Sequence, residues 1–306
     1  MNSIEKILFW QEPINYFLQK AAAGWLLYLW NFFSVLANPA IFLLVFVLYY
    51  WNINKDKGAR IAYNCAFILL SVNIIKSFLN IRRPYSLSSR IDMLELDMSG
   101  TGSSFPSGHS ALSAGLYTSL FLTSFKNVIG MLVMILIPII VATSRMVLGM
   151  HYILDVLVGL GLGYGITFIF FRLLLKMQSF LRNNLPLSVI LSSVSGAISL
   201  VLSILMTTKT ISHIQFADLA ISLSLLSGLI FGLYMENRFV KFLTRARRAK
   251  KVLRMILGVI PIAIAFVFLS NTPEVVGCFL LYFFISTWAT LLFPLIGIHS
   301  NLFYIV

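Results

Sequence analysis

Long apolar runs recur along the whole chain, and they constrain its fold more than any other feature. Each run approaches the ~20 residues that a helix needs to cross the hydrocarbon core of a bilayer. Hydrophobic residues make up 59% of the 306 positions and charged residues only 11%, so polar side chains are too few to cover a water-soluble surface. The sequence therefore predicts an all-α fold, a polytopic transmembrane helical bundle.

We expect about nine spans in this bundle. Two neighbouring runs are separated only by Lys126 and Asn127 and could form one broken helix, but their combined length favours two spans. The predicted spans cover residues 33–51, 59–77, 109–125, 128–145, 152–174, 186–207, 214–235, 252–270 and 276–296. They divide the chain into an amphipathic segment (1–32), a five-span core (33–182) and a carboxyl-terminal four-span extension (183–306).

The amino-terminal segment has the pattern of a helix that lies in the membrane interface. It mixes charged residues with an irregular apolar face, unlike the basic, apolar and small-residue order of a cleavable signal peptide. The apolar face consists of Ile4, Ile7, Leu8, Ile14, Phe17 and Leu18. Tryptophans suit the headgroup zone, which predicts that Trp10, Trp25, Trp30 and Trp51 lie there.

The distribution of basic residues predicts the orientation of the bundle. Alternate loops contain 15 of the 23 basic residues but only Asp56 and Glu236 of the ten acidic ones, and so carry the whole formal net charge of +13. Lys and Arg in short loops accumulate on the cytoplasmic side. With an odd number of spans, this places the amino terminus outside and the carboxyl terminus inside. The densest basic run, residues 238–254, is explained by this topology, and we expect no nucleic-acid partner.

Three polar blocks fall on the opposite, electrically neutral side. The first runs from Lys76 to Pro84, the second from Pro106 to His109, and the third from Ser144 to Asp155. Their convergence on one membrane face follows from the charge pattern alone, and it predicts a functional site there.

The residue types in these blocks suit phosphate chemistry. Lys76, Arg83 and Arg145 offer positive charge to a dianion, and arginine pairs with phosphate oxygens through two hydrogen bonds. Pro106 in a first helical turn, followed by Ser107 and Gly108, would direct backbone amides toward the same anion.

Two histidines supply the reactive groups. His151 and Asp155 are four residues apart, so on a helix the carboxylate can hold one ring nitrogen and leave the other as a nucleophile. His109 can then protonate the leaving alkoxide and later activate water.

The blocks KSFLNIRRP, PSGH and SRMVLGMHYILD resemble the signature of the type 2 phosphatidic acid phosphatase superfamily, which includes lipid phosphate phosphatases and vanadium haloperoxidases. The resemblance covers about residues 60–170 and indicates a membrane-integral, bacterial member. It implies a phosphoric monoester hydrolase that uses no metal and no cofactor. The implied catalytic residues are His151 as nucleophile, His109 as general acid and Asp155 as its orienter, and the implied phosphate-binding residues are Lys76, Arg83, Arg145, Ser107 and Gly108.

Three hypotheses about function are consistent with the sequence. The first is hydrolysis of a lipid phosphate or pyrophosphate at the outer face of a bacterial cytoplasmic membrane, with the bilayer and its lipids as partners. The second is hydrolysis of a soluble ester such as a sugar phosphate. The third, from another class, is an anion or lipid transporter, although a conduit needs neither a nucleophile nor a proton donor. The sequence predicts no oligomeric state and assigns no role to the last four spans.

Two further patterns carry weaker expectations. The charged loop residues Arg82, Arg90, Asp92, Glu95 and Asp97 either shape substrate entry or are simply solvated. Alternating glycines, Gly159, Gly161, Gly163 and Gly165, favour close helix packing over ligand contact. Cys65 and Cys278 lie in apolar runs and predict neither a disulfide nor a metal site.

Overall fold

The computed structural model describes residues 3–22, 24–95, 102–269 and 272–305. Helices make up nearly all of the regular structure, which confirms the predicted all-α bundle. The chain forms two compact units. Unit 1 contains Met1–Phe42 and Ile68–Ile169, and unit 2 contains Leu43–Phe67 and Phe170–Val306.

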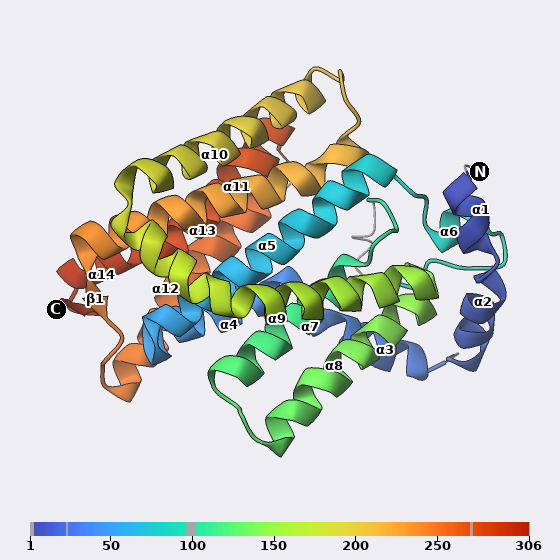
Figure 1. The fold of residues 1–306 in the computed structure, drawn as a ribbon, viewed down its shortest axis with the longest axis horizontal. Coiled ribbons are helices and arrows are strands. Elements are labelled where there is room, and N and C mark those ends of the chain that lie inside the picture. The colour runs from blue at the N-terminus through green and yellow to red at the C-terminus, as the bar shows by residue number, and fades with distance from the viewer. Residues whose placement is uncertain (1–2, 23, 96–101, 270–271, 306) are drawn as a thin grey trace. The chain divides into compact units, whose positions relative to one another are not determined.

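Figure 1 labels the α-helices and β1, numbered in chain order. The first helices are α1 (Ser3–Phe9), α2 (Glu12–Ala21), α3 (Leu26–Val35), α4 (Pro39–Leu48), α5 (Lys55–Leu79), α6 (Pro84–Leu87), α7 (Gly108–Thr123), α8 (Val128–Val147) and α9 (Ile153–Asn183). They are followed by α10 (Leu185–Thr207), α11 (His213–Met235), α12 (Arg248–Leu269), α13 (Leu281–Thr287) and α14 (Phe293–His299). Short π-helical segments are η1 (Tyr49–Ile53), η2 (Glu236–Val240), η3 (Val275–Leu280) and η4 (Trp288–Leu292), and the strands β1 (Phe242–Leu243) and β2 (Tyr304–Ile305) pair antiparallel.

Fewer helices than predicted are long enough to cross a membrane. Within the described ranges, seven helices pass by length and composition, or up to eight if the bent pair Leu26–Val35 and Pro39–Ile53 counts as one span. The predicted span 109–125 corresponds to α7, which has only 16 residues. At 1.5 Å per residue it is roughly 24 Å long, short of the ~30 Å hydrocarbon core. The described residues therefore contain seven or eight candidate spans by length, against about nine predicted.

The separation of α7 from α8 is encoded locally. Asn127 is the N-cap of α8, and its side-chain oxygen accepts a hydrogen bond from the Gly130 amide at 2.8 Å. An amide side chain in this position satisfies one of the donors that a helix start leaves unpaired. The two-helix interpretation of this region is correct.

In unit 1, α7 packs against α8 and α9. A Cβ atom on Gly159 would lie 2.5 Å from the Ser107 carbonyl oxygen, and one on Gly163 would lie 2.3 Å from that of Ala111. At Gly161 and Gly165 a Cβ atom would meet nothing within 4 Å. The predicted close packing is thus confirmed for Gly159 and Gly163, which lie one helical turn apart, and not for Gly161 and Gly165.

The amino-terminal helices divide their apolar residues between two surroundings. Ile14 and Leu18 of α2 pack on a buried cluster of unit 1 formed by Ala142, Met146 and Val156. Trp10 and Phe17, in contrast, are 63% and 70% exposed. We therefore interpret one side of this segment as a packing face and the other as available to lipid.

Trp51 does not lie at an exposed interface as predicted. It is fully buried in unit 2, where its indole N–H donates to the Ala289 carbonyl at 2.8 Å. Its ring packs against Phe293 with centroids 4.6 Å apart. The prediction relied on the basic loop that follows Trp51, but η1 directs the Trp51 side chain into the protein.

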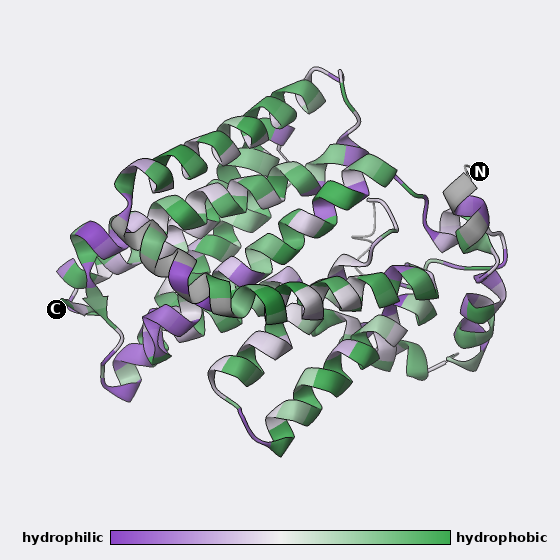
Figure 2. Ribbon diagram, in the orientation of Figure 1, coloured by the Kyte–Doolittle hydropathy of each residue, from purple (hydrophilic) through white to green (hydrophobic). Residues whose placement is uncertain are grey.

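In unit 2, α10, α11 and α13 run side by side (Figure 1). Figure 2 shows hydrophobic colouring along most of α10, as expected for helices that face lipid. Arg254 of α12 is fully buried, and it donates to the carbonyls of Trp51 and Leu302 at 2.7 and 2.9 Å. This member of the basic run is therefore part of the core of unit 2.

Candidate active site

Hydrogen bonds join the first polar block to the segment that directly precedes the second. The Ser104 amide donates to the Ile81 carbonyl at 2.7 Å, and the Ile81 amide donates to Ser103 Oγ at 2.9 Å. Arg83 Nε donates to the Gly102 carbonyl at 2.9 Å. The loop after α5, which contains Arg83, is thereby fixed against the segment that leads into α7.

The second and third blocks are joined through Asp155. The Ser107 amide donates to the Asp155 carbonyl at 2.9 Å, and Ser104 Oγ donates to Asp155 Oδ2 at 2.5 Å. Gly159 lets α9 approach the Ser107 carbonyl one turn further on. Three segments far apart in the sequence therefore meet within unit 1.

The start of α7 faces Lys76. Ser107 is the N-cap and accepts a hydrogen bond from the Ser110 amide, so Pro106 precedes the cap instead of lying in the first helical turn as predicted. Gly108 is the first residue of α7, and a Cβ atom there would lie 3.9 Å from Lys76 Nζ. The helix start and this ammonium group thus border the same space, which suits an anion.

His151 lies beside Asp155 but outside the helix. Because α9 begins at Ile153, His151 belongs to the preceding turn, and the expectation that both residues share a helix was wrong. Asp155 Oδ2 accepts the Tyr152 amide at 2.8 Å, as the third residue of a capping box does. His151 Nδ1 is 3.6 Å from the same oxygen, beyond hydrogen-bonding distance.

The His151 side chain is 2% exposed, and its surroundings are positively charged. Burial lowers the pKa of the imidazole well below its usual value, and the nearby groups Arg83, Arg145, Lys76 and His109 lower it further. The ring is therefore neutral at pH 7, which is the form that can act as a nucleophile. The same cations would attract a phosphate ester to it.

Arg145 is held by a carboxylate that the sequence did not link to it. Its guanidinium donates to both oxygens of Glu95, one of them at 3.2 Å, and to Ser34 Oγ at 2.6 Å. Both partners of the ion pair are buried, with side chains 1% and 4% exposed. Glu95 thus occupies the arginine fork that was predicted to bind phosphate.

The other charged loop residues pair with the amino-terminal helices. The Arg82 side chain donates two hydrogen bonds to Glu5, at 3.0 and 3.1 Å, and Arg90 lies 3.4 Å from Glu12. The Asp92 backbone exchanges two hydrogen bonds with the Gln19 side chain. These contacts identify Arg82, Arg90 and Asp92 as structural links, while Asp97 lies outside the described residues.

Sequence reasoning missed several residues that contact the site. Ser104 precedes the second block by two residues, and its position in a serine-rich stretch was the only available signal. Ser34, Gln11 and Asn15 come from the amino-terminal segment, and nothing in the local sequence relates them to residues more than a hundred positions away.

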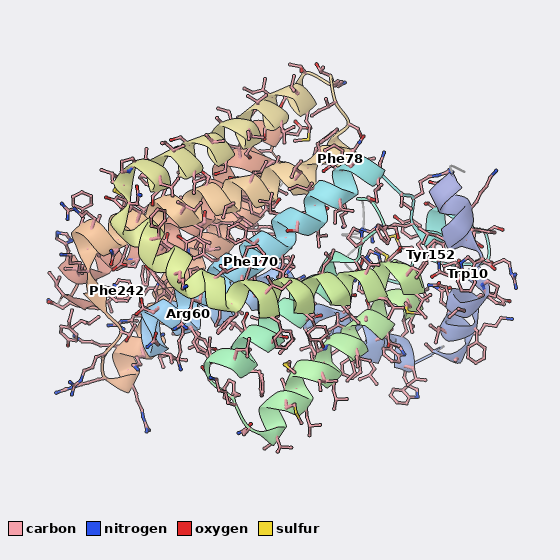
Figure 3. The ribbon with its side chains drawn as sticks, in the orientation of Figure 1. Trp10, Arg60, Phe78, Tyr152, Phe170 and Phe242 are labelled. Atoms are coloured by element: carbon pink, nitrogen blue, oxygen red, sulfur yellow. The ribbon has the colours of Figure 1, made fainter. Side chains whose placement is uncertain are left out.

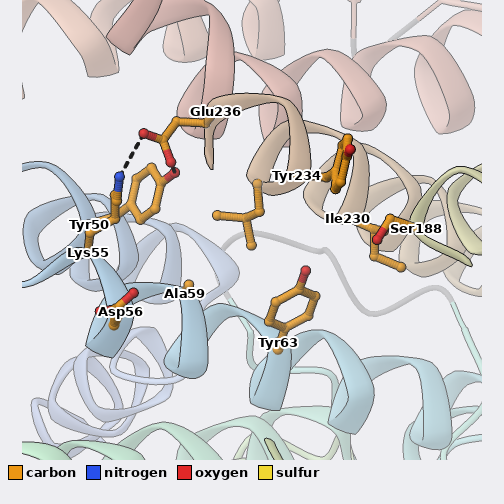
Figure 4. A pocket seen from close by; sticks show the side chains of 10 residues that line it. Tyr50, Lys55, Asp56, Ala59, Tyr63, Ser188, Ile230, Tyr234 and Glu236 are labelled. Atoms are coloured by element: carbon orange, nitrogen blue, oxygen red, sulfur yellow. Dashed lines mark hydrogen bonds and ion pairs between the residues drawn. The ribbon is translucent and has the colours of Figure 1, made fainter. Parts of the chain in front are cut away.

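A separate pocket of about 340 Å³, including its open mouth, lies within unit 2 (Figure 4). Glu236 is buried at its edge and accepts hydrogen bonds from Lys55 at 2.8 Å and from the Tyr50 hydroxyl at 3.2 Å. The Phe242 amide also donates to it at 3.2 Å. The Glu236 carboxylate is thus used in holding η1, α5 and η2 together.

Comparison with known families agrees with this picture. A family model described as the PAP2 superfamily matches residues 57–178. A second model, described as the PAP2 superfamily phosphatase transmembrane extension, matches residues 220–303. No curated protein and no solved structure matches the chain.

The fold and these matches define a multi-pass membrane protein of a phosphatase family. The chain belongs to the PAP2 superfamily, as a membrane-integral member that carries the transmembrane extension of that family. All the predicted catalytic and phosphate-binding residues fall within the first match. The second match gives most of the carboxyl-terminal spans, to which the sequence assigned no role, a place in the family.

Proposed function

We propose that this protein hydrolyses phosphate or pyrophosphate esters of membrane lipids through a phosphohistidine. The observation that carries the proposal is the position of His151. Its imidazole is buried beside Asp155, and burial and nearby cations keep it neutral. Candidate substrates are polyprenyl pyrophosphate, phosphatidate, phosphatidylglycerophosphate and sphingoid phosphates, all of which present a phosphate at the headgroup layer.

The first step is attack of the His151 Nε2 lone pair on phosphorus. Asp155 faces Nδ1, so Nε2 is the nitrogen available for the attack. A bond forms between nitrogen and phosphorus while the bond from phosphorus to the leaving oxygen breaks, and protonated His109 gives its proton to that oxygen and becomes neutral. Lys76, Arg83, the Ser107–Gly108 backbone and Arg145 stabilise the charge on the phosphoryl oxygens.

The second step returns the enzyme to its starting state. Neutral His109 removes a proton from water, whose oxygen attacks phosphorus. The bond between His151 and phosphorus breaks, and inorganic phosphate leaves. The 3.6 Å separation between His151 and Asp155 is compatible with this scheme, since catalytic hydrogen bonds are often long before substrate binds.

A lipid substrate is favoured by the exposed aromatic residues of unit 1. Trp10, Phe17 and Trp25 are between 63% and 73% exposed, and such side chains concentrate at the headgroup layer of a bilayer. α2, which carries Phe17, also contacts the turn that contains His151. A site held at this depth could receive a lipid phosphate while the acyl chains stay in the membrane.

Phosphate release by the purified protein, with a chelator present, tests the proposal. We expect turnover of lipid phosphates over sugar phosphates, inhibition by vanadate, and an acid-labile, alkali-stable phosphoenzyme that is lost in His151→Ala. Faster turnover of sugar phosphates would favour the soluble-ester hypothesis. Absence of hydrolysis, together with anion flux into proteoliposomes that survives His151→Ala, would replace the enzyme hypothesis by transport.

We further propose that the site faces outward from a bacterial cytoplasmic membrane. The support is the charge asymmetry of the loops, which leaves the basic run 238–254 on the opposite side from the three polar blocks.

A further inference from the structure

Two amide side chains of the amino-terminal segment are completely buried against the turn that contains His151. Gln11 is the N-cap residue of α2 and Asn15 lies in its first half, and both are 0% exposed. Both precede residue 57, where the PAP2 superfamily match begins. Buried amides are normally hydrogen-bonded, so their partners indicate what they do.

The partners lie at both ends of the turn between α8 and α9. Asn15 Nδ2 donates to the Met146 carbonyl at 3.0 Å and to the His151 carbonyl at 2.9 Å. Gln11 Oε1 accepts the Leu154 amide at 2.9 Å, one of the first-turn donors that a helix leaves unpaired. Residues 146–154 are thus held by side chains from another part of the chain.

Apolar contacts place α2 firmly on the same turn. Ile14 and Leu18 pack on Met146 and Val156, and Leu8 of α1 packs on Tyr152, the residue after His151. Figure 3 labels Tyr152 on the side of the picture where α1 and α2 lie. The α2 helix is therefore fixed by packing, which also holds the amide side chains of Gln11 and Asn15 in place.

We propose that α2 is a positioning element of the active site, in which Asn15 and Gln11 hold the backbone around His151 so that its ring faces Asp155 and the cations. This inference rests on the proposed function. His151 precedes the first turn of α9, so its place depends on the turn that these amides hold. A displacement of about 1 Å at a reacting group can reduce the rate about 100-fold.

Replacement of Asn15 tests the inference through the separation of kcat from KM. Asn15→Leu keeps the side-chain size but removes both donors. We expect kcat to fall about 10- to 100-fold with little change in KM, because the phosphate-binding cations stay in place. Ala21→Ser, an exposed position on the same helix, is the matched control and should keep the wild-type kcat.

A pair of Gln11 variants provides the conservative rescue. Gln11→Glu keeps the oxygen that accepts the Leu154 amide, whereas Gln11→Leu removes it. We expect Gln11→Glu to retain most of the wild-type kcat and Gln11→Leu to lose it. Size-exclusion profiles and melting temperatures in detergent report how much of each variant is folded. This pair tests the positioning role even if Asn15→Leu does not fold.

The possible results separate the two proposals. A wild-type protein that releases no phosphate from any substrate contradicts the proposed function. An active wild-type protein whose folded Asn15 and Gln11 variants keep the normal kcat contradicts the positioning role alone. Equal losses of kcat in Gln11→Glu and Gln11→Leu would also contradict it, because the acceptor oxygen would then make no difference.

Discussion

The ion pair between Arg145 and Glu95 has a direct consequence for anion binding. A phosphate ester that uses the Arg145 guanidinium has to replace the Glu95 carboxylate, which now binds both of its terminal nitrogens. Removal of one partner of a buried ion pair leaves an uncompensated charge and costs about 3–5 kcal/mol. A bound anion can restore that compensation.

We therefore predict that Glu95→Gln lowers the melting temperature of the free protein but increases its stabilisation by inorganic phosphate or vanadate. The measurement is a melting curve in detergent at increasing anion concentration, since a ligand that binds only the folded state stabilises it more the tighter it binds. Glu5→Gln is the control, because Glu5 is also buried but pairs with Arg82. Equal anion responses in the two variants would contradict the prediction.

Burial of His151 and, after it, the positive groups around the ring set the pH dependence of the proposed reaction. In the proposed mechanism the imidazole must be neutral to attack phosphorus, and its pKa lies below the usual value. Activity should thus persist below pH ~6.5 and be lost only as the pH falls through this lowered pKa.

We predict that Arg83→Gln moves the acidic limb of kcat/KM to higher pH, because it removes a positive charge that opposes protonation of His151. Arg83→Lys keeps the charge and should leave the limb in place, even though kcat/KM falls with loss of the guanidinium geometry. A profile of kcat/KM against pH for the three proteins is the measurement. A limb that moves toward lower pH in Arg83→Gln would refute this electrostatic account.

At this scale the sequence offered candidates for the reactive groups but none for the side chains that hold them in place. Residue types and spacing within the three blocks were sufficient to propose His109, His151, Asp155 and the cations. The contacts of Asn15 with His151 and of Ser34 with Arg145 span 136 and 111 positions, and no local pattern encodes them. Such contacts depend on tertiary packing, which a single sequence does not specify.

Among the elements, α7 and α9 are brought together by glycines spaced one turn apart. Gly159 and Gly163 leave room for the backbone of α7, while Gly161 and Gly165 face open space. The alternation in the sequence indicated close packing but could not show which pair faces the neighbour, because that depends on the rotation of α9.

We predict that Gly159→Ala destabilises the protein and reduces phosphatase activity, since the new methyl group would displace Ser107, the N-cap of α7. Overpacking of this kind typically costs about 1–3 kcal/mol. Gly161→Ala is the matched control and should be neutral or slightly stabilising. Melting temperature and phosphate release, measured side by side, are the readouts, and equal effects of the two changes would argue against this close approach.

Helix boundaries show where local signals were adequate and where they were not. Asn127 was identified as a break and is indeed a cap. Two helix starts next to the site were predicted too early, one at Pro106 and one before His151. The side chains of Ser107 and Asp155 cap these helices, and the sequence prediction considered neither as a capping residue.

Across the whole molecule, charge and apolar length predicted a membrane protein with about nine spans, and the described residues contain seven or eight candidates. The hydropathy of residues 109–125 does not distinguish a spanning helix from a shorter one that begins at a site, as α7 does. Arg254 and Glu236 were counted with the loops, yet both are buried in unit 2 with their hydrogen bonds satisfied by the protein. A charge at the end of a span can thus be structural.

The predicted orientation can be measured with introduced cysteines, because the two native ones, Cys65 and Cys278, are buried and should react slowly. Ser89→Cys marks the exposed loop next to the candidate site, and Ala249→Cys marks the exposed start of α12 in the basic run. If positive loops are cytoplasmic, a membrane-impermeant maleimide should label Ser89→Cys in intact cells and Ala249→Cys only after permeabilisation. The unaltered protein, with its two native cysteines, gives the background. Labelling in the reverse order would put the site on the cytoplasmic face, where its phosphate-bearing substrates would have to be supplied from the inner leaflet.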